Sequence, residues 1–298
     1  STVAATDYYI YVDGKGAAQG QAEVSLSCVA CVTPTVDSES LSGETVCQGG
    51  SPSALSITAS GTNISYQWYS NTSASTGGAS TVGTDSPTYT PSAASSGTLY
   101  YYCVVTGDCG SAQSSYSGAI VVETAPTAPT SITGTTTICE NTTTTLTAAG
   151  GTEGDGATYE WGTGAVVGTN TIGGATLSSY TTASLSTNTT YWVRRVGSSS
   201  CSNTTGGVTQ LVTVEAAPTA PTSITGTTTI CENTTTTLTA AGGTEGDGAT
   251  YEWGTGAVAG TNTIGGATSS SYTTASLSAN TTYWVRRVGS TSCSNTTG

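Results

Sequence analysis

The residues of this chain whose type and spacing indicate possible chemistry are its nine cysteines. Six of them recur with a period of 92 residues (139 − 47 = 92), as two series: Cys47, Cys139, Cys231 and Cys109, Cys201, Cys293. Within each period the two cysteines are 62 residues apart (109 − 47 = 62). The chain has no histidine to complete a mixed zinc site, and two cysteines per period fall short of four zinc ligands. The spacing therefore predicts three disulfides, each within one repeat: Cys47–Cys109, Cys139–Cys201 and Cys231–Cys293.

Three further cysteines lie outside these two series. Cys103 is in LYYYCVV, where it shares one face of a predicted strand with Tyr101 and Val105, so we expect a buried free thiol. Cys28 and Cys31 could pair with each other or with residues outside the chain. The odd total leaves at least one thiol unpaired or intermolecular. Disulfides indicate an oxidising compartment, outside the cytoplasm.

Paired carboxylates occur in a glycine-rich loop, as Glu153 and Asp155 and again as Glu245 and Asp247. Carboxylate and carbonyl oxygens could bind calcium there, although two carboxylates fall short of an EF-hand and a solvated turn is the alternative. A general acid needs burial to raise its pKa, and an exposed loop does not supply it. Without histidine we predict no catalytic residues, no enzyme and no cofactor other than calcium.

The four arginines occur as two adjacent pairs, one in each of the two copies of the strand-like segment NTTYWVRRV. Glu160 and Glu252 flank tryptophans in the segments expected to pair with them, which predicts cross-strand Glu–Arg pairs. A second interpretation makes these residues a contact for a glycan or partner, with an exposed tryptophan beside arginine. Its members are Trp192, Arg194, Trp284 and Arg286.

The elements that must position these residues are repeated strands. Residues 125–206 and 217–298 align without a gap and differ only at Val167/Ala259, Leu177/Ser269, Thr187/Ala279 and Ser199/Thr291. Alternating Thr, Val and Tyr stretches separated by Gly and Asn predict short strands and no helix. The fold class is therefore all-β: tandem Ig-like β-sandwich domains of about seven strands, with one intradomain disulfide each. The predicted domains are 33–124 (diverged), 125–216 and 217–298, preceded by residues 1–32.

Composition excludes several partners. Five basic and eighteen acidic residues give a net charge of −13, which argues against nucleic acid and against an anionic membrane surface. No run of apolar residues is long enough to predict membrane insertion.

The order ICEN-TTTTLTA-GG-YEW-NTTYWVR-C resembles the Ig-like repeats of large secreted surface proteins in Bacteroidota. The first repeat, with YQWYSNTSASTGG and LYYYCVVTGDCG, resembles a sister class. Such modules occur in giant adhesins, including SprB-type gliding-motility adhesins exported by the type IX secretion system. The resemblance implies an extracellular or cell-surface location and a role as the stalk or filament of an adhesin. The alternative is a set of tandem carbohydrate-binding or spacer modules of a secreted enzyme.

The two ends of the sequence do not match. Residues 207–215 close the second repeat, whereas the third repeat stops at Gly298, before any counterpart. Residues 1–32 look like closing strands of a preceding domain or a donor-strand segment. We therefore expect a window on a longer array, or a filament in which copies join by β-strand addition. Neighbouring copies or domains and surface glycans are the predicted partners.

Overall fold

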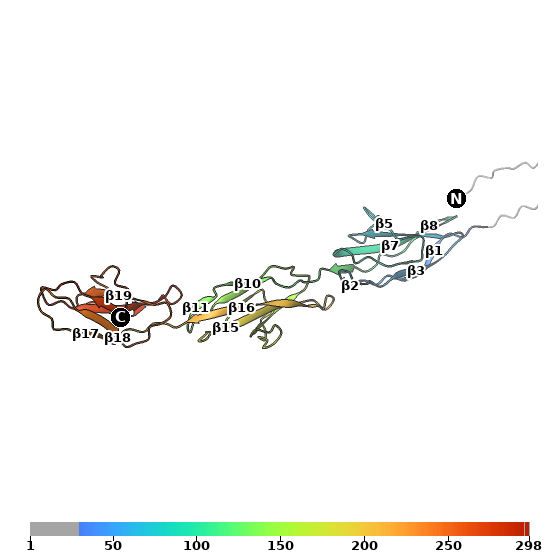
Figure 1. Ribbon diagram of the computed structural model, residues 1–298. Helices are drawn as coiled ribbons and strands as arrows, with labels where there is room; N and C mark the ends of the chain where they lie inside the picture. Colours follow the sequence, from blue (N-terminus) through green and yellow to red (C-terminus); the bar gives the residue numbers. More distant parts are fainter. Residues whose placement is uncertain (1–29, 295, 298) are drawn as a thin grey trace, which may run out of the picture. The chain divides into compact units, whose positions relative to one another are not determined.

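The computed structural model describes residues 30–294 with Thr296 and Thr297, and all of its described regular elements are β-strands (Figure 1). The all-β prediction is confirmed. Predictions for residues 1–29, including Cys28, lie outside the described residues. We call residues 33–124, 125–216 and 217–298 repeats 1, 2 and 3.

The chain forms two compact units. Of the described residues, the first unit comprises 30–42, Ala54–Tyr89 and Tyr100–Gly118; the second comprises Gly43–Ser53, Thr90–Leu99 and the described residues from Ala119 onward. The first unit thus holds much of repeat 1. The second holds the remainder of repeat 1 together with repeats 2 and 3.

The first unit contains two groups of antiparallel strands. One is a three-stranded sheet of order β1 (Thr35–Ser40), β3 (Leu55–Ser60), β6 (Thr88–Tyr89). The other has β4 (Ser65–Asn71) between β5 (Ser80–Val82) and β7 (Gly97–Gly107), with β8 (Gly110–Gln113) on β7. Trp68 lies opposite Cys103 in this second group, and both side chains are fully buried. Tyr101 and Val105 are also buried, as the alternation predicts for one face of a strand.

The part of repeat 1 in the second unit centres on β9 (Ile120–Glu123). This strand runs parallel to β2 (Glu44–Cys47) and antiparallel to the first residues of β7. Cys47 is opposite Glu123, so the last residue of β2 lies beside the last residue of β9.

Repeat 2 has seven strands in two sheets, as predicted. The strands of the first sheet are β10 (Ser131–Gly134), β12 (Thr145–Ala149) and β14 (Ser179–Thr181), in that order. The second sheet has the order β11 (Thr137–Cys139), β16 (Thr204–Glu215), β15 (Thr189–Val196), β13 (Thr158–Thr163).

The core of repeat 2 collects the alternate apolar side chains of these two sheets. Leu146, Trp161, Val193 and Val212 are fully buried there. The indole of Trp161 donates to the carbonyl of Leu177 at 2.9 Å, which satisfies its one polar group. The predicted core tryptophan is confirmed.

Repeat 3 has the same first sheet but a shorter second one. The first sheet is β17 (Ser223–Gly226), β18 (Thr237–Ala241), β20 (Ser271–Thr273); the second is β19 (Thr250–Thr255), β21 (Tyr283–Val288), β22 (Thr296–Thr297). Residues 229–231, the counterparts of β11, form no strand. In repeat 2 that strand pairs with Thr213–Glu215, whose counterparts would be residues 305–307, beyond Gly298.

Candidate functional site

The cysteines join successive repeats. Cys47 bonds to Cys201 and Cys139 bonds to Cys293, each across 154 residues of sequence. The prediction of disulfides within repeats (Cys47–Cys109, Cys139–Cys201, Cys231–Cys293) is therefore wrong. The first cysteine of one repeat bonds to the second cysteine of the next.

Strand length explains why the predicted pairing fails in repeat 2. Cys139 is opposite Glu215, the last residue of β16, whereas Cys201 precedes the first residue of that strand, Thr204. A strand of 12 residues spans about 40 Å. A disulfide requires Cα atoms within about 7 Å. The Cα atoms of Cys139 and Cys293 are 4.8 Å apart.

Hydrogen bonds surround the Cys47–Cys201 disulfide. The hydroxyl of Ser198 donates to Glu123 Oε2 at 2.6 Å, and it accepts from the backbone N–H of Cys201 at 3.0 Å. The N–H of Thr124 donates to Asp155 Oδ2 at 2.7 Å, and the N–H of Asp155 donates to the carbonyl of Thr124 at 3.0 Å. Repeat 2 thus holds the last residues of repeat 1 through side-chain and backbone contacts as well as through the disulfide.

The same contacts recur 92 residues later. Ser290 donates to Glu215, the N–H of Ala216 donates to Asp247 Oδ2 at 2.8 Å, and the N–H of Asp247 donates back to Ala216. We call each set the inter-repeat clamp. The first clamp consists of Cys47, Cys201, Glu123, Thr124, Asp155 and Ser198, and the second of Cys139, Cys293, Glu215, Ala216, Asp247 and Ser290.

A buried arginine adjoins each clamp. The side chain of Arg195 is 2% exposed and donates to the carbonyls of Thr127 (2.6 Å) and Gly150 (2.9 Å) and to the hydroxyl of Tyr159 (3.2 Å). That tyrosine in turn donates to Glu153 at 2.9 Å. The arginine therefore ties the proline-containing linker to the glycine-rich loop. Arg287 makes the equivalent bonds to Thr219, Gly242 and Tyr251 in repeat 3.

This role of Arg195 was not predicted from the sequence. The alternation of side chains along the strand was a usable signal, because successive residues of a strand face opposite sides. If Arg194 reaches Glu160 on the outer face, Arg195 must face inward and needs buried acceptors.

The carboxylates proposed for calcium accept hydrogen bonds from groups of the protein. Asp155 and Asp247 hold linker backbone, whereas Glu153 and Glu245 accept from tyrosine hydroxyls. Among the described residues no group of three or more His, Cys, Asp or Glu side chains could hold a metal ion. Calcium binding stays an untested prediction.

The Glu160–Arg194 and Glu252–Arg286 pairs form as predicted, between directly opposite residues of neighbouring strands. The alternative that needs an exposed Trp192 is wrong, because that side chain is fully buried and its indole donates to the carbonyl of Thr169 at 2.8 Å. Its counterpart Trp284 is only 7% exposed. Gly162 lies opposite Trp192, and a Cβ there would be 2.2 Å from the ring. Glycine at 162 lets the indole pack flat on the strand.

The remaining cysteines fall into three states. Cys31 bonds to Cys109, so the prediction that it pairs with Cys28 or with residues outside the chain is wrong. Cys103 is a buried free thiol, as predicted, and burial raises its pKa from 9.0 to about 11. Cys231 is free and exposed, although its counterparts in repeats 1 and 2 are bonded.

The chain is similar to several solved structures and to one known domain family. No helix in the described part of the chain is long and apolar enough to cross a membrane. No curated protein sequence matches the chain. Similar solved structures include the FN1-FN3 domains of chicken CNTN1, with 15% identity over 90% of this chain and 95% of that chain and a TM-score of 0.32. An I-band fragment from titin has 12% identity over 91% of this chain and 96% of that chain, with a TM-score of 0.41.

The family profile of the Ig-like domain CHU_C associated matches residues 32–122, 126–215 and 218–298. Together the three matches cover most of the sequence. The chain belongs to this family of Ig-like domains and carries three tandem copies of it.

Proposed function

We propose that this chain is a structural array that forms the stalk or filament of an extracellular bacterial surface adhesin, acting in adhesion or gliding motility. The observation that carries the proposal is the repeated inter-repeat disulfide, Cys47–Cys201 and Cys139–Cys293. A covalent bond between each repeat and the next suits a part that transmits force. Disulfides of this kind form and persist outside the cytoplasm.

The near identity of repeats 2 and 3 supports the same function. A binding site is specified by particular side chains, whereas a stalk is specified by how many modules it has. The clamp residues recur at one pitch, so modules can be added or removed while every remaining junction keeps its contacts. The role in SprB-type gliding-motility adhesins, implied by the sequence resemblance, is a narrower form of this proposal.

The test is removal of one pitch in the organism that encodes the chain. Deleting residues 125–216 makes repeat 3 follow repeat 1 directly. Cys47 can then bond to Cys293, so the clamp can form again. We expect the shortened protein to be labelled by antibody on intact cells and to support attachment or gliding at a reduced level. A full deletion strain is the reference for complete loss.

Two results would overturn the proposal. One is antibody labelling that requires cell lysis. The other is loss of attachment on deleting 125–216 that equals the full deletion while the shortened protein is still displayed, because that pattern indicates a single site within repeat 2.

A further inference from the structure

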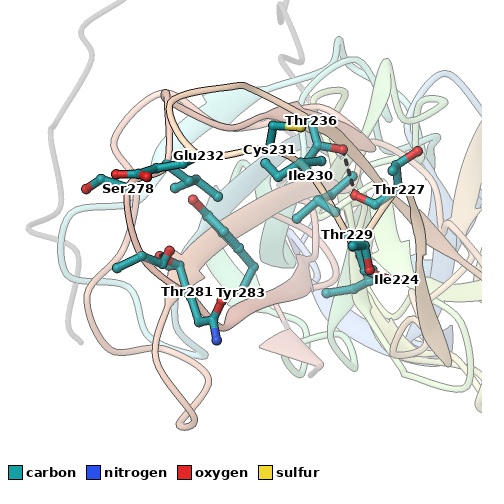
Figure 2. Close-up of a pocket in the computed structure, with 15 residues that line it drawn as sticks. Ile224, Thr227, Thr229, Ile230, Cys231, Glu232, Thr236, Ser278, Thr281 and Tyr283 are labelled. Carbon is teal, nitrogen blue, oxygen red and sulfur yellow. Dashed lines mark hydrogen bonds between the residues drawn. The ribbon is translucent and has the colours of Figure 1, made fainter.

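The groove of about 730 Å³ in repeat 3 is a strand position of the Ig-like fold (Figure 2). Figure 2 shows Ile230 and Tyr283 among the side chains around it. In repeat 2 the residue that matches Ile230 is Ile138, which is buried in the same core cluster as Val212 of β16. The groove therefore corresponds to the place that the second half of β16 fills in repeat 2, so it is explained by the fold alone.

Repeat 1 has a row of three tyrosines on the outer face of the sheet that contains β4, with β5 and β7 beside it (Figure 1). Trp68 and Cys103 lie opposite each other and point into the core, so their neighbours Tyr69 and Tyr102 point outward. The rings of these two tyrosines are stacked, with centroids 4.9 Å apart and an angle of 9° between their planes. The ring of Tyr116 is nearly perpendicular to that of Tyr102, with centroids 5.5 Å apart. We call Tyr69, Tyr102 and Tyr116 the tyrosine row.

The segment that carries Tyr116 is fixed on β7 by two buried serines. The N–H of Tyr101 donates to Ser117 Oγ at 2.9 Å, and the N–H of Cys103 donates to Ser114 Oγ at 2.8 Å. The N–H groups of the two serines donate back to the carbonyls of Cys103 and Tyr101, at 2.9 and 2.8 Å. The ring of Tyr116 is therefore in place before any ligand arrives, which lowers the entropic cost of binding.

The same face of repeat 2 is covered by main chain. Aligned on the core tryptophan of each repeat, Tyr69 matches Gly162, and the residues opposite them, Tyr102 and Trp192, also match. In repeat 2 the polypeptide around Thr169 covers the indole and accepts its hydrogen bond at 2.8 Å. Repeat 1 has a tyrosine where repeat 2 has glycine, so side chains and not main chain form this part of its surface.

The neighbours of the tyrosine row on β4 and β7 are uncharged. On this face of repeat 2, Glu160 and Arg194 lie opposite each other and form an ion pair. The matching residues of repeat 1 are Gln67 and Val104, which also lie opposite each other. An ionised ligand would meet no opposite charge from these residues, so the face complements an uncharged ligand.

The tyrosine row presents both a ring face and hydroxyls. One face of Tyr69 packs on Tyr102, so its other face is turned toward Thr81, the exposed residue opposite it on β5. Burial raises the pKa of Tyr102, and the nearby hydroxyls of Tyr69 and Tyr116 raise it further, so the three hydroxyls lie close together. Each tyrosine hydroxyl can both donate and accept a hydrogen bond.

We propose that the tyrosine row of repeat 1 binds uncharged sugar units of a surface polysaccharide. The negative face of an aromatic ring attracts the C–H groups of a sugar, and the hydroxyls of the row exchange hydrogen bonds with sugar hydroxyls. Centroid separations of 4.9 and 5.5 Å make the row about as long as a disaccharide, whereas a stable protein interface takes roughly 800 Å² from each partner. The inference rests on the proposed function and adds a partner to it: repeat 1 makes the contact, and the near-identical repeats set its reach.

The first measurement is affinity electrophoresis of the full chain in native gels that contain a polysaccharide. Laminarin, xylan, galactomannan and hydroxyethyl cellulose are the uncharged probes, and alginate and polygalacturonate are the anionic ones. We expect at least one uncharged polysaccharide to slow the chain, and its soluble oligosaccharide to restore the mobility. Neither anionic polysaccharide should slow the chain, because its net charge is −13 and the row offers no cation.

Substitutions in the row locate the contact. Tyr69→Ala and Tyr116→Ala should each weaken binding about tenfold or more, because each removes a ring from the contact. Tyr69→Phe and Tyr116→Phe keep the ring and should each weaken binding about threefold, through loss of one hydroxyl. Val166→Ala, at an exposed apolar side chain of repeat 2, is the control and should bind like the unmodified chain.

The buried thiol of Cys103 reports whether repeat 1 is still folded in each variant. Iodoacetamide should leave it unmodified in every chain whose binding is compared. If an Ala variant unfolds, the double variant Tyr69→Phe, Tyr116→Phe takes its place, because both rings stay packed. That double variant should weaken binding about tenfold.

Several results would overturn the inference. One is a chain that no uncharged polysaccharide slows, or that only the anionic ones slow. Binding that persists unchanged in the folded Ala variants, or in the double Phe variant, places the contact elsewhere. Loss of cell attachment in Tyr69→Ala, by a chain that binds no polysaccharide, assigns the row to a protein partner.

Failure of the proposed function gives a different pattern. A chain that binds polysaccharide through the row, but is labelled by antibody only after cell lysis, removes the proposed function and leaves the sugar site. A chain that is displayed on cells, with a graded effect of repeat number and no binding to polysaccharide, removes the sugar site and leaves the proposed function.

Discussion

Cys139 and Cys293 lie 154 residues apart in the sequence, yet their Cα atoms are 4.8 Å apart at the junction of repeats 2 and 3. Cys47 and Cys201 have the same relationship, with Cα atoms 4.9 Å apart. The two disulfide-closed loops overlap between Cys139 and Cys201. This overlap couples all three repeats, because opening either junction acts on a loop that includes repeat 2.

Disulfide mapping gives the first prediction. Proteolysis of the oxidised chain without reductant should release a Cys47–Cys201 peptide and a Cys139–Cys293 peptide. On the chain-entropy account, closing a loop of this length stabilises the folded array by about 5 kcal/mol. Loss of both disulfides in a Cys47→Ser, Cys139→Ser chain should therefore lower the thermal midpoint strongly. Recovery of a Cys47–Cys109 peptide would contradict the structure.

Force spectroscopy gives the second prediction. Suppose that the unfolded chain is stretched between the backbones of residues 47 and 293. The shortest covalent path then runs from Cys47 through its disulfide to Cys201, along the backbone to Cys139, and through the second disulfide to Cys293. That path has roughly 62 residues instead of roughly 246, so the extended length falls from about 850 Å to about 210 Å. Single-molecule extension should show the short length in oxidising buffer and the long one after reductant is added. Equal lengths under both conditions would exclude the overlapping loops.

The disulfide partners could not be read from the sequence, although the fold could. Thr- and Val-rich alternation and the core tryptophans predict the sandwich, and the structure has it. The strict period of 92 residues, however, does not show whether cysteines bond within one repeat or between successive repeats, because both kinds of pairing recur with the same period. The length of β16, which separates Cys139 from Cys201, is what distinguishes them.

The burial of Trp192 was missed for a related reason. The sequence shows a tryptophan two residues before an arginine, on the same outward face of a strand, and an exposed binding surface can have the same pattern. The polypeptide around Thr169 covers the ring and accepts its indole hydrogen bond. A loop that folds back on a sheet leaves no periodic signal, so only the structure shows it.

Thiol reactivity gives the third prediction. Iodoacetamide at pH 8 should modify Cys231 in the folded chain and leave Cys103 intact, because burial raises the pKa of Cys103 to about 11 and shields its sulfur. The folded-state pKa of Cys103 lies above its ordinary value of 9.0. The stability due to its burial is therefore complete below pH 9 and is lost as the pH rises toward 11.

Mass spectrometry of labelled peptides is the measurement for these two thiols. Unfolding in denaturant without reductant is the control, and there Cys103 should react as well. Labelling of Cys103 in the folded chain at a rate equal to that of Cys231 would contradict its burial.

The last prediction compares two neighbouring arginines of β15. Arg195→Met should destabilise repeat 2 by about 3 kcal/mol, because it leaves the buried carbonyls of Thr127 and Gly150 without a donor. Arg194→Met should cost less than about 1 kcal/mol, because the Glu160 pair is partly exposed to solvent. The two substitutions remove the same charge from the same strand.

Hydrogen exchange can measure this difference with repeat 3 as an internal reference. Peptides that contain Val167 or Ala259 differ in mass, so the two repeats can be followed separately in one sample. A loss of about 3 kcal/mol corresponds to a protection factor more than 100-fold lower in repeat 2. Arg287→Met should transfer the same loss to repeat 3. Equal effects of Arg194→Met and Arg195→Met would mean that charge, and not the buried hydrogen bonds to the linker, sets the stability of the junction.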